Sequence, residues 1–314
     1  MVVLGIHIGS AQMRAGMVDE KGAILAARSV STPNELESFC GALHDALDWL
    51  IDASGKPDAV GVSCKGKIDR DSTRVEILPG ALHFLQGLAL SDLVGMPLDV
   101  PVFADNDARV ALAGEVVWGA ARGRQDAVML TLGAGVGGAV LCGGSLLRGH
   151  SGVAGQLGHL TVEPDGAVCL CGNRGCLETV FSARAIEAAA WSAVHRGCSS
   201  VLTQLFRGQP QLATCRTVFQ AAAEGDGVAR AIVTGAMDRL APAIVSLAHI
   251  FDPEVVILGG QAADAAADFL DDLRQRVWTR SRTLLGRDLP IVEAQVADKS
   301  GILSAAGLAI APHS

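Results

Sequence analysis

The sequence lacks the features that would direct it to a membrane or to nucleic acid. It has no run of about 18 uncharged apolar residues, the length needed to span a bilayer, and no basic segment before its apolar first residues, as a targeting signal would require. The net charge is −8 without long runs of one sign, which disfavours a basic surface for nucleic acid. We therefore expect a cytoplasmic protein with neither a membrane nor a nucleic-acid partner.

Low-complexity segments are also missing, and the whole chain of 314 residues, half of them hydrophobic, is expected to fold. This length suits two domains of about 150 residues each. Apolar runs that end in glycine turns occur at 2–8 and again at 127–132. Each is followed by further predicted strands and helices, among them a single helix at about 264–285. Strands alternating with helices predict an α/β class, and the repeated order indicates an internal duplication.

Eight cysteines are present, and three of them, Cys169, Cys171 and Cys176, fall within eight positions. In a cytosolic protein such a cluster indicates a metal before a disulfide. His159 precedes it at loop distance and completes a Cys₃His set, which is typical of a closed, structural zinc site. Three unligated cysteines in a loop are the alternative. A redox dithiol is disfavoured because the C-x-C segment does not open a helix.

The stretch Gly155–His159, followed by Cys169–Glu178, resembles the signature of the ROK family of bacterial sugar kinases and sugar-responsive repressors. Three further segments are similar to family motifs and occur in the family's order: the catalytic segment that begins at Asp105, the second phosphate loop at 130–138, and the adenosine-side turn at 257–260. The resemblance therefore extends over the whole chain.

This resemblance implies two actin-like (ribonuclease H-like) domains around a central cleft, with a zinc-stapled loop. We expect the first domain to comprise 1–118 plus 298–314 and the second 119–297, because the last predicted helix follows the second repeat and has no strand of its own to cover. A sugar would bind deep in the cleft and ATP across the glycine turns. The resemblance also implies a homodimer.

The resemblance assigns Asp107 as the general base that takes the proton from the attacking sugar hydroxyl. His159 would bind zinc through one ring nitrogen and the sugar through the other. From the residues alone, the favoured interpretation of Asp107 is a helix N-cap. For Glu178 the less favoured alternative is an acidic residue that offsets a helix dipole. The sugar contacts implied by the family are Asn106, Asp107, Gln156, His159 and Glu178.

For ATP, the resemblance implies Gly9, Ser10, Gln12, Gly133, Gly135, Gly259 and Gly260. The glycines at 133–138 also match the dinucleotide-binding fingerprint. That interpretation is rejected because a strand rather than a helix is predicted at 139–142.

The first phosphate loop departs from the family pattern Asp-x-Gly-Gly-Thr-Lys. Here His7 replaces the aspartate that helps to hold Mg²⁺, and Ala11 and Gln12 replace the threonine and lysine. Ala134 replaces a threonine in the second loop, and Gln156 replaces a glutamate that contacts sugar.

We therefore expect ATP-dependent, Mg²⁺-assisted phosphorylation of a hexose or hexose-like sugar, including an amino sugar or a cyclitol. The alternative is a weak or inactive sugar-binding homologue that acts as a sensor or regulator. A DNA-binding repressor is disfavoured, because the chain is acidic and begins in a predicted strand rather than a helix-turn-helix.

Overall fold

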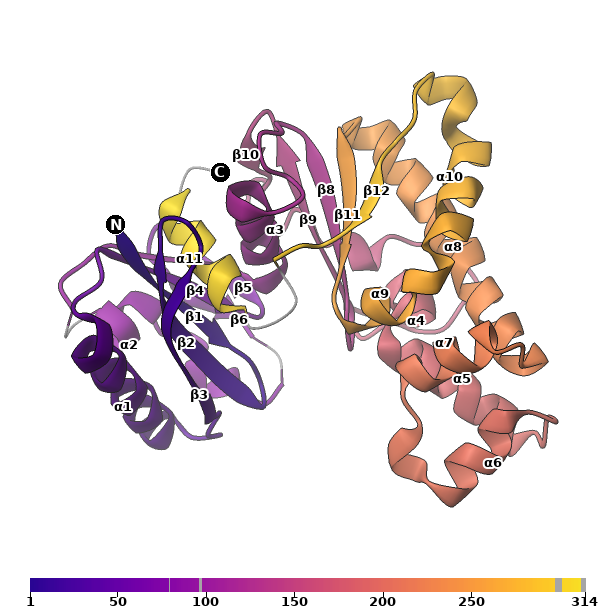
Figure 1. The fold of residues 1–314 in the computed structure, drawn as a ribbon, viewed down its shortest axis with the longest axis horizontal. Helices are drawn as coiled ribbons and strands as arrows, with labels where there is room; N and C mark the ends of the chain where they lie inside the picture. Colours follow the sequence, from indigo (N-terminus) through magenta and orange to yellow (C-terminus); the bar gives the residue numbers. More distant parts are fainter. Residues whose placement is uncertain (79, 96–97, 297–300, 312–314) are drawn as a thin grey trace. The chain divides into compact units, whose positions relative to one another are not determined.

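The computed structural model describes residues 1–78, 80–95, 98–296 and 301–311, which form two compact units (Figure 1). One unit comprises Met1–Gln125, Val140–Gly155 and Ala294–Ser314, and the other comprises Asp126–Ala139 and Gln156–Glu293. The α/β class predicted from the alternation of strands and helices is confirmed.

The first sheet has the strand order β3-β2-β1-β4-β7. Strand β1 (Val2–Ile8) pairs antiparallel with β2 (Gln12–Asp19), which pairs antiparallel with β3 (Ile24–Ser31). On its other side β1 is parallel to β4 (Ala59–Cys64), and β4 is parallel to β7 (Val102–Asn106). The carboxyl ends of β1, β4 and β7 therefore lie along one edge of this sheet.

The two faces of β1 pack against different helices. Leu4, Ile6 and Ile8 belong to the main hydrophobic cluster, to which α1 (Leu36–Ser54) contributes its apolar face. The i, i+4 spacing of buried residues in α1 produces this face. A smaller pair of strands, β5 (Lys67–Ile68) and β6 (Val75–Ile77), and the short helices η1 (His83–Leu85) and α2 (Leu90–Gly95) follow in the chain.

The opposite face is covered by α11 (Ile302–Ile310), which lies over β1 and β4 and beside α3 (Asp107–Trp118) (Figure 1). Glycines make this close approach possible. A Cβ atom on Gly5 would overlap the Ile302 carbonyl oxygen, and one on Gly61 would overlap that of Ala305. The last helix of the chain thus belongs to the same unit as the first strand.

The second sheet repeats the order of the first, β10-β9-β8-β11-β12, as the predicted duplication requires. Its strands are β8 (Ala127–Leu132), β9 (Val136–Cys142), β10 (Ser145–Leu146), β11 (Val255–Gly259) and β12 (Ile291–Glu293). Strand β11 is parallel to both β8 and β12. The carboxyl ends of β8 and β11 therefore share one edge.

The helical elements of the second unit are η2 (Leu157–His159), α4 (Glu178–Phe181), α5 (Ala183–His195), α6 (Val201–Gly208), η3 (Pro210–Leu212), α7 (Cys215–Ala223), α8 (Gly227–Phe251), α9 (Gln261–Ala265), η4 (Ala267–Phe269) and α10 (Leu270–Leu285). The single helix predicted at about 264–285 is wrong in its first part. There the chain forms α9 and η4 before α10 begins, with Ala266 closing α9.

Helix α8 is long and apolar enough to cross a membrane by length and composition. Half of its most apolar window is buried inside the fold, and its Asp238 forms an ion pair with Arg276 of α10. These contacts are those of a core helix in this unit.

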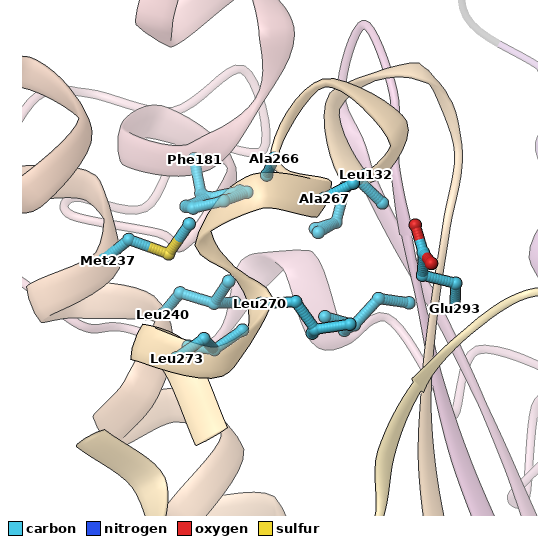
Figure 2. Close-up of a pocket in the computed structure, with 11 residues that line it drawn as sticks. Leu132, Phe181, Met237, Leu240, Ala266, Ala267, Leu270, Leu273 and Glu293 are labelled. Atoms are coloured by element: carbon cyan, nitrogen blue, oxygen red, sulfur yellow. The ribbon is translucent and has the colours of Figure 1, made fainter. Parts of the chain in front are cut away.

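A small enclosed cavity lies in the second unit between β8, α4, α8 and α10. Figure 2 shows its lining of apolar side chains, with the Glu293 carboxylate at one side. Its volume is only about 10 Å³, at the lower limit for a single water molecule. It is a packing gap rather than a site for a ligand.

Candidate functional site

The carboxyl edge of the first sheet gathers polar side chains. The register pairs His7 of β1 with Ser63 of β4, and Ser63 with Asp105 of β7. His7 Nδ1 lies 3.2 Å from Ser63 Oγ. The next residues along these strands lead into the first glycine turn after β1 and into α3 after β7. In open α/β sheets, ligands bind at this end of parallel strands.

Asn106 holds the junction between β7 and α3. Its Oδ1 accepts a hydrogen bond from the Ala108 amide at 3.0 Å, and its Nδ2 donates to the Gly66 carbonyl at 2.9 Å. Asn106 is therefore the N-cap of α3. The alternative role of Asp107 as the N-cap is wrong, because Asp107 is the first residue within the helix.

Asp107 is a half-buried carboxylate at this edge. Burial raises its pKa, while the positive charge of Lys65 and the nearby His7 ring oppose that rise. One oxygen accepts a hydrogen bond from the Ala108 amide at 3.0 Å. A carboxylate with a raised pKa is a stronger base than an exposed one, which suits proton abstraction near neutral pH.

His7 lies one residue before the end of β1, level with Asp105 in the register of the sheet. Burial lowers its pKa, the Asp107 carboxylate raises it, and the Arg14 cation lowers it. The net effect is a lowered pKa, so the imidazole is neutral at neutral pH. Gly301, at a φ of 68°, packs against this ring, and a side chain there would collide with it.

A buried ionic cluster supports the same edge. Asp105 Oδ1 accepts from Arg109 Nε at 2.7 Å, and Asp105 Oδ2 accepts from Arg148 Nε at 3.0 Å. Arg109 also donates to the carbonyl oxygens of Gly152 and Ala154, both at 3.1 Å. This cluster was not predicted from the sequence. The i, i+4 spacing of Asp105 and Arg109 on an otherwise apolar segment was the available signal.

The first glycine turn is closed by the Gly9 amide, which donates to the Gln12 carbonyl at 3.1 Å. Thr32 Oγ1 donates to the Gly9 carbonyl at 2.7 Å. Ser10 and Gln12 are exposed on this turn, and Gln12 Oε1 accepts a hydrogen bond from Arg14 at 3.2 Å.

In the second unit, the four predicted metal ligands come together. One ligand atom from each of His159, Cys169, Cys171 and Cys176 lies within 4.8 Å of all the others. Cys169 Sγ is 3.6 Å from His159 Nδ1, and Cys171 Sγ is 3.7 Å from Cys176 Sγ. Tetrahedral zinc with ordinary bond lengths separates its ligand atoms by about 3.5 to 3.8 Å. The donor set and its spacing therefore fit zinc.

The loop that carries the cysteines is shaped by glycines and backbone hydrogen bonds. Gly172 and Gly175 have φ values of 92° and 64°, and a side chain on Gly175 would overlap the Glu163 carbonyl. The Cys169 amide donates to the Asn173 carbonyl at 2.7 Å, which closes the turn between the thiols. The path of the backbone in this loop thus brings the cysteine ligands together.

The three thiols have different acidities without a metal. Burial raises the pKa of Cys169 and raises that of Cys176 to about 12. The hydrogen bond from the Asn173 amide lowers the pKa of the exposed Cys171. A bound dication would stabilise the thiolate form of all three.

Glu178 links this cluster to the second glycine turn. The Val136 amide donates to Glu178 Oε2 at 2.8 Å, and Cys169 Sγ lies 3.9 Å from Oε1. A side chain on Gly135 would overlap the Glu178 carboxylate. Glu178 is also the first residue of α4, the position that the helix-dipole alternative requires. Its hydrogen bond to the Val136 amide is compatible with that position.

The other predicted positions in this unit are distributed as follows. His159 is half-buried at the end of η2, whereas Gln156 is exposed just before it. Gly133 and Gly135 follow β8, and their backbones are joined by a hydrogen bond of 2.9 Å. Gly259 ends the adjacent strand β11, and Gly260, with a φ of 92°, lies against the Leu132 carbonyl.

The glycine turn at 133–138 is followed by β9 rather than by a helix. Its amides therefore do not open a helix toward a pyrophosphate, and the dinucleotide-binding interpretation is excluded as predicted.

Comparison with known proteins extends over nearly the whole chain. The sequence profile of the ROK family matches residues 3–311. The chain is 34% identical to a glucokinase of Thermotoga maritima over 98% of its own length and 96% of the relative's. It is 32% identical to an N-acetylmannosamine kinase of Escherichia coli O157:H7 over 83% of each chain.

The fold is similar to solved structures as well. The crystal structure of a ROK family glucokinase from Streptomyces griseus in complex with glucose and AMPPNP superposes with a TM-score of 0.75. That similarity covers 99% of both chains at 30% sequence identity.

Proposed function

This chain belongs to the ROK family, and we propose that it transfers the γ-phosphate of ATP to a hydroxyl group of a hexose or hexose-like sugar. The observation that carries this proposal is the half-buried Asp107 carboxylate, with its raised pKa, at the sheet edge that also bears the first glycine turn. The sugar kinases among its relatives support a phosphotransferase over a binding protein.

In the proposed reaction, Asp107 takes the proton of the attacking sugar hydroxyl. The sugar oxygen forms a bond to the γ-phosphorus as the bond between that phosphorus and the bridging oxygen of ADP breaks, so that ADP leaves. Such a positioned base contributes about 10²–10⁴-fold to the rate. Mg²⁺ bound to ATP would neutralise phosphate oxygens during this transfer.

We assign the sugar contacts to Asn106, Gln156, His159 and Glu178 together with Asp107. The fixed carboxylate of Glu178, held by the Val136 amide, supports this assignment. ATP is assigned to the glycine turns at residues 9–12, 133–135 and 259–260. The Gly9 and Gly133 amides are already bonded within their turns, so phosphate oxygens would be bound by other backbone amides of these turns, without a side chain.

We assign zinc to His159, Cys169, Cys171 and Cys176, where it would stabilise the loop and fix the His159 ring. The expected domain division, 1–118 plus 298–314 and 119–297, the cytoplasmic location and the homodimer remain proposals.

The test is an assay of ADP release with Mg²⁺ and a panel of glucose, mannose, N-acetylmannosamine, N-acetylglucosamine and inositol. We expect turnover with at least one of them, and a loss of about 10²-fold or more in Asp107→Asn. Asp71→Asn, which changes an exposed carboxylate of the same unit, is the control. Sugar binding without ADP release would establish the sensor alternative, which the changes at His7, Ala11, Gln12 and Ala134 motivate.

A further inference from the structure

Lys65 is the first residue after β4, at the edge of the sheet where Asp107 lies. The register pairs Cys64 of β4 with Asn106 of β7, so Lys65 and Asp107 are the next residues on two neighbouring strands. Both follow the direction of parallel strands and leave the sheet at the same edge. Lys65 therefore lies next to the carboxylate that we assign as the base.

The backbone that carries Lys65 is held from two sides. The Gly66 carbonyl accepts a hydrogen bond from Asn106 Nδ2 at 2.9 Å. Gly66 has a φ of 92°, and a Cβ atom there would overlap the Ile77 carbonyl oxygen. Only glycine fits this position, so the loop has a fixed path and the Lys65 side chain begins at a fixed point.

The charge of Lys65 acts on the nearby Asp107 carboxylate, but its ammonium group is engaged less closely than the cations of its neighbours. Its side chain is exposed, and across the described ranges no hydrogen bond or ion pair engages its ammonium group. Lys67, the first residue of β5, is bound to Glu76 at 2.5 Å. Arg109 and Arg148 are bound to Asp105.

The proposed reaction requires a positive charge near the phosphoryl group that is transferred. The transferring phosphoryl group carries negative charge on three oxygens, which kinases stabilise with cations. In this chain His7 is neutral at the end of β1, and Gln12 supplies an amide where a lysine would supply a cation. An ammonium group binds a phosphate oxygen as a compact point charge.

We propose that the Lys65 ammonium group binds an anionic oxygen beside Asp107, and that this oxygen belongs to the γ-phosphate of the donor. The inference rests on the proposed kinase function and adds a residue to it. The same cation would also suit a carboxylate or phosphate carried by the acceptor sugar, and the experiment separates these two sources.

The test compares the unmodified protein with Lys65→Met, Lys65→Arg and the control Lys67→Met. Calorimetry with saturating glucose measures the binding of AMPPNP, which has a γ-phosphate, and of ADP, which lacks one. We expect Lys65→Met to weaken AMPPNP binding about tenfold, the magnitude of one charge-assisted hydrogen bond, and ADP binding less than about twofold. Lys65→Arg should restore most of the loss, and Lys67→Met should change neither ligand.

Three results would overturn the proposal. The first is equal weakening, or no weakening, of AMPPNP and ADP in Lys65→Met. The second is a raised KM for glucuronate, but not for glucose, with AMPPNP binding unchanged, because the anion would then belong to the acceptor. The third is failure of the unmodified protein to bind AMPPNP. The assay of ADP release tests the kinase function independently of these binding measurements. A failure of the Lys65 proposal can therefore be distinguished from a failure of the proposed kinase function.

Discussion

Arg109 Nε donates a hydrogen bond to Asp105 Oδ1 at 2.7 Å, and only 3% and 1% of their respective side chains are exposed. The other oxygen of the same carboxylate accepts from Arg148. Through its two remaining nitrogens Arg109 binds the carbonyls of Gly152 and Ala154, so the pair ties the start of α3 to the loop that precedes the glycine-rich signature. Asp105 is also the residue that leads into Asn106 and Asp107.

Asp105→Asn should therefore be strongly destabilising. It would leave the buried Arg109 guanidinium without its carboxylate partner, and breaking a buried pair in this way costs about 3 to 5 kcal/mol. Urea denaturation should show this loss in the free energy of unfolding. Asp271→Asn breaks the exposed pair with Arg274 and should have little effect. Equal effects of the two substitutions would show that the buried cluster does not stabilise the fold.

Zinc should be bound at about one ion per chain and should be lost together with stability in Cys171→Ser, because metal binding and folding of the loop are coupled. Metal analysis and thermal unfolding measure the two effects. Cys142→Ser, which changes an exposed cysteine outside the cluster, should retain zinc, and a chelator should lower its Tm as it does that of the unmodified protein. A metal-free protein that unfolds at the same temperature as the metal-bound form would refute a structural zinc.

The sequence was sufficient for those parts of the site whose residues are close in the chain. The metal ligands all lie between His159 and Cys176, and the glycine turns can be recognised from their high glycine content. The internal duplication could be predicted because each half opens with an apolar run that ends in a glycine turn, and the two sheets do share one strand order.

Contacts between distant segments were not predictable in the same way. Arg148 reaches Asp105 across 43 residues, and Lys65 lies next to Asp107 only because β4 and β7 are paired in one register. No local pattern encodes either relationship. The error at about 264–285 has a different cause. The alanine-rich run there has high helix propensity throughout, so the local sequence does not mark the interruption at Ala266 and η4, where α9 ends before α10 begins.

Asp107→Asn should raise stability at neutral pH while it lowers turnover about 10²-fold or more. Burial raises the pKa of Asp107 in the folded state above its unfolded value. The stability that this group contributes is therefore present below the unfolded pKa and is lost as pH rises through the folded pKa. At neutral pH the charged carboxylate opposes folding, and the neutral amide removes that penalty.

Thermal unfolding of Asp107→Asn and the unmodified protein, compared at pH 7 and at about pH 4, checks the sign. The variant should have the higher Tm at pH 7, and the difference should shrink at the lower pH. Asp71→Asn should show no such dependence. If Asp107→Asn is the less stable protein at pH 7, the carboxylate is stabilised by contacts that outweigh its burial.

His7→Asp should raise turnover or lower the KM for MgATP, if His7 is what limits phosphoryl transfer. Burial lowers the pKa of His7, so at neutral pH the imidazole has no charge and is a poor ligand for the hard Mg²⁺ ion. A carboxylate at this position could accept a hydrogen bond from Ser63 and direct an oxygen to Mg²⁺. It would also place a second negative charge near Asp107, so the acid limb of the pH profile of kcat should move to higher pH.

His7→Asn, of the same size as the aspartate variant but uncharged, is the matched control and should give neither effect. ADP release at varied Mg²⁺ concentration measures the gain, which should disappear as Mg²⁺ is withdrawn. No gain in His7→Asp at any Mg²⁺ concentration would mean that His7 alone does not limit transfer, and that Gln12 and Ala134 must be changed with it to restore the phosphate loops.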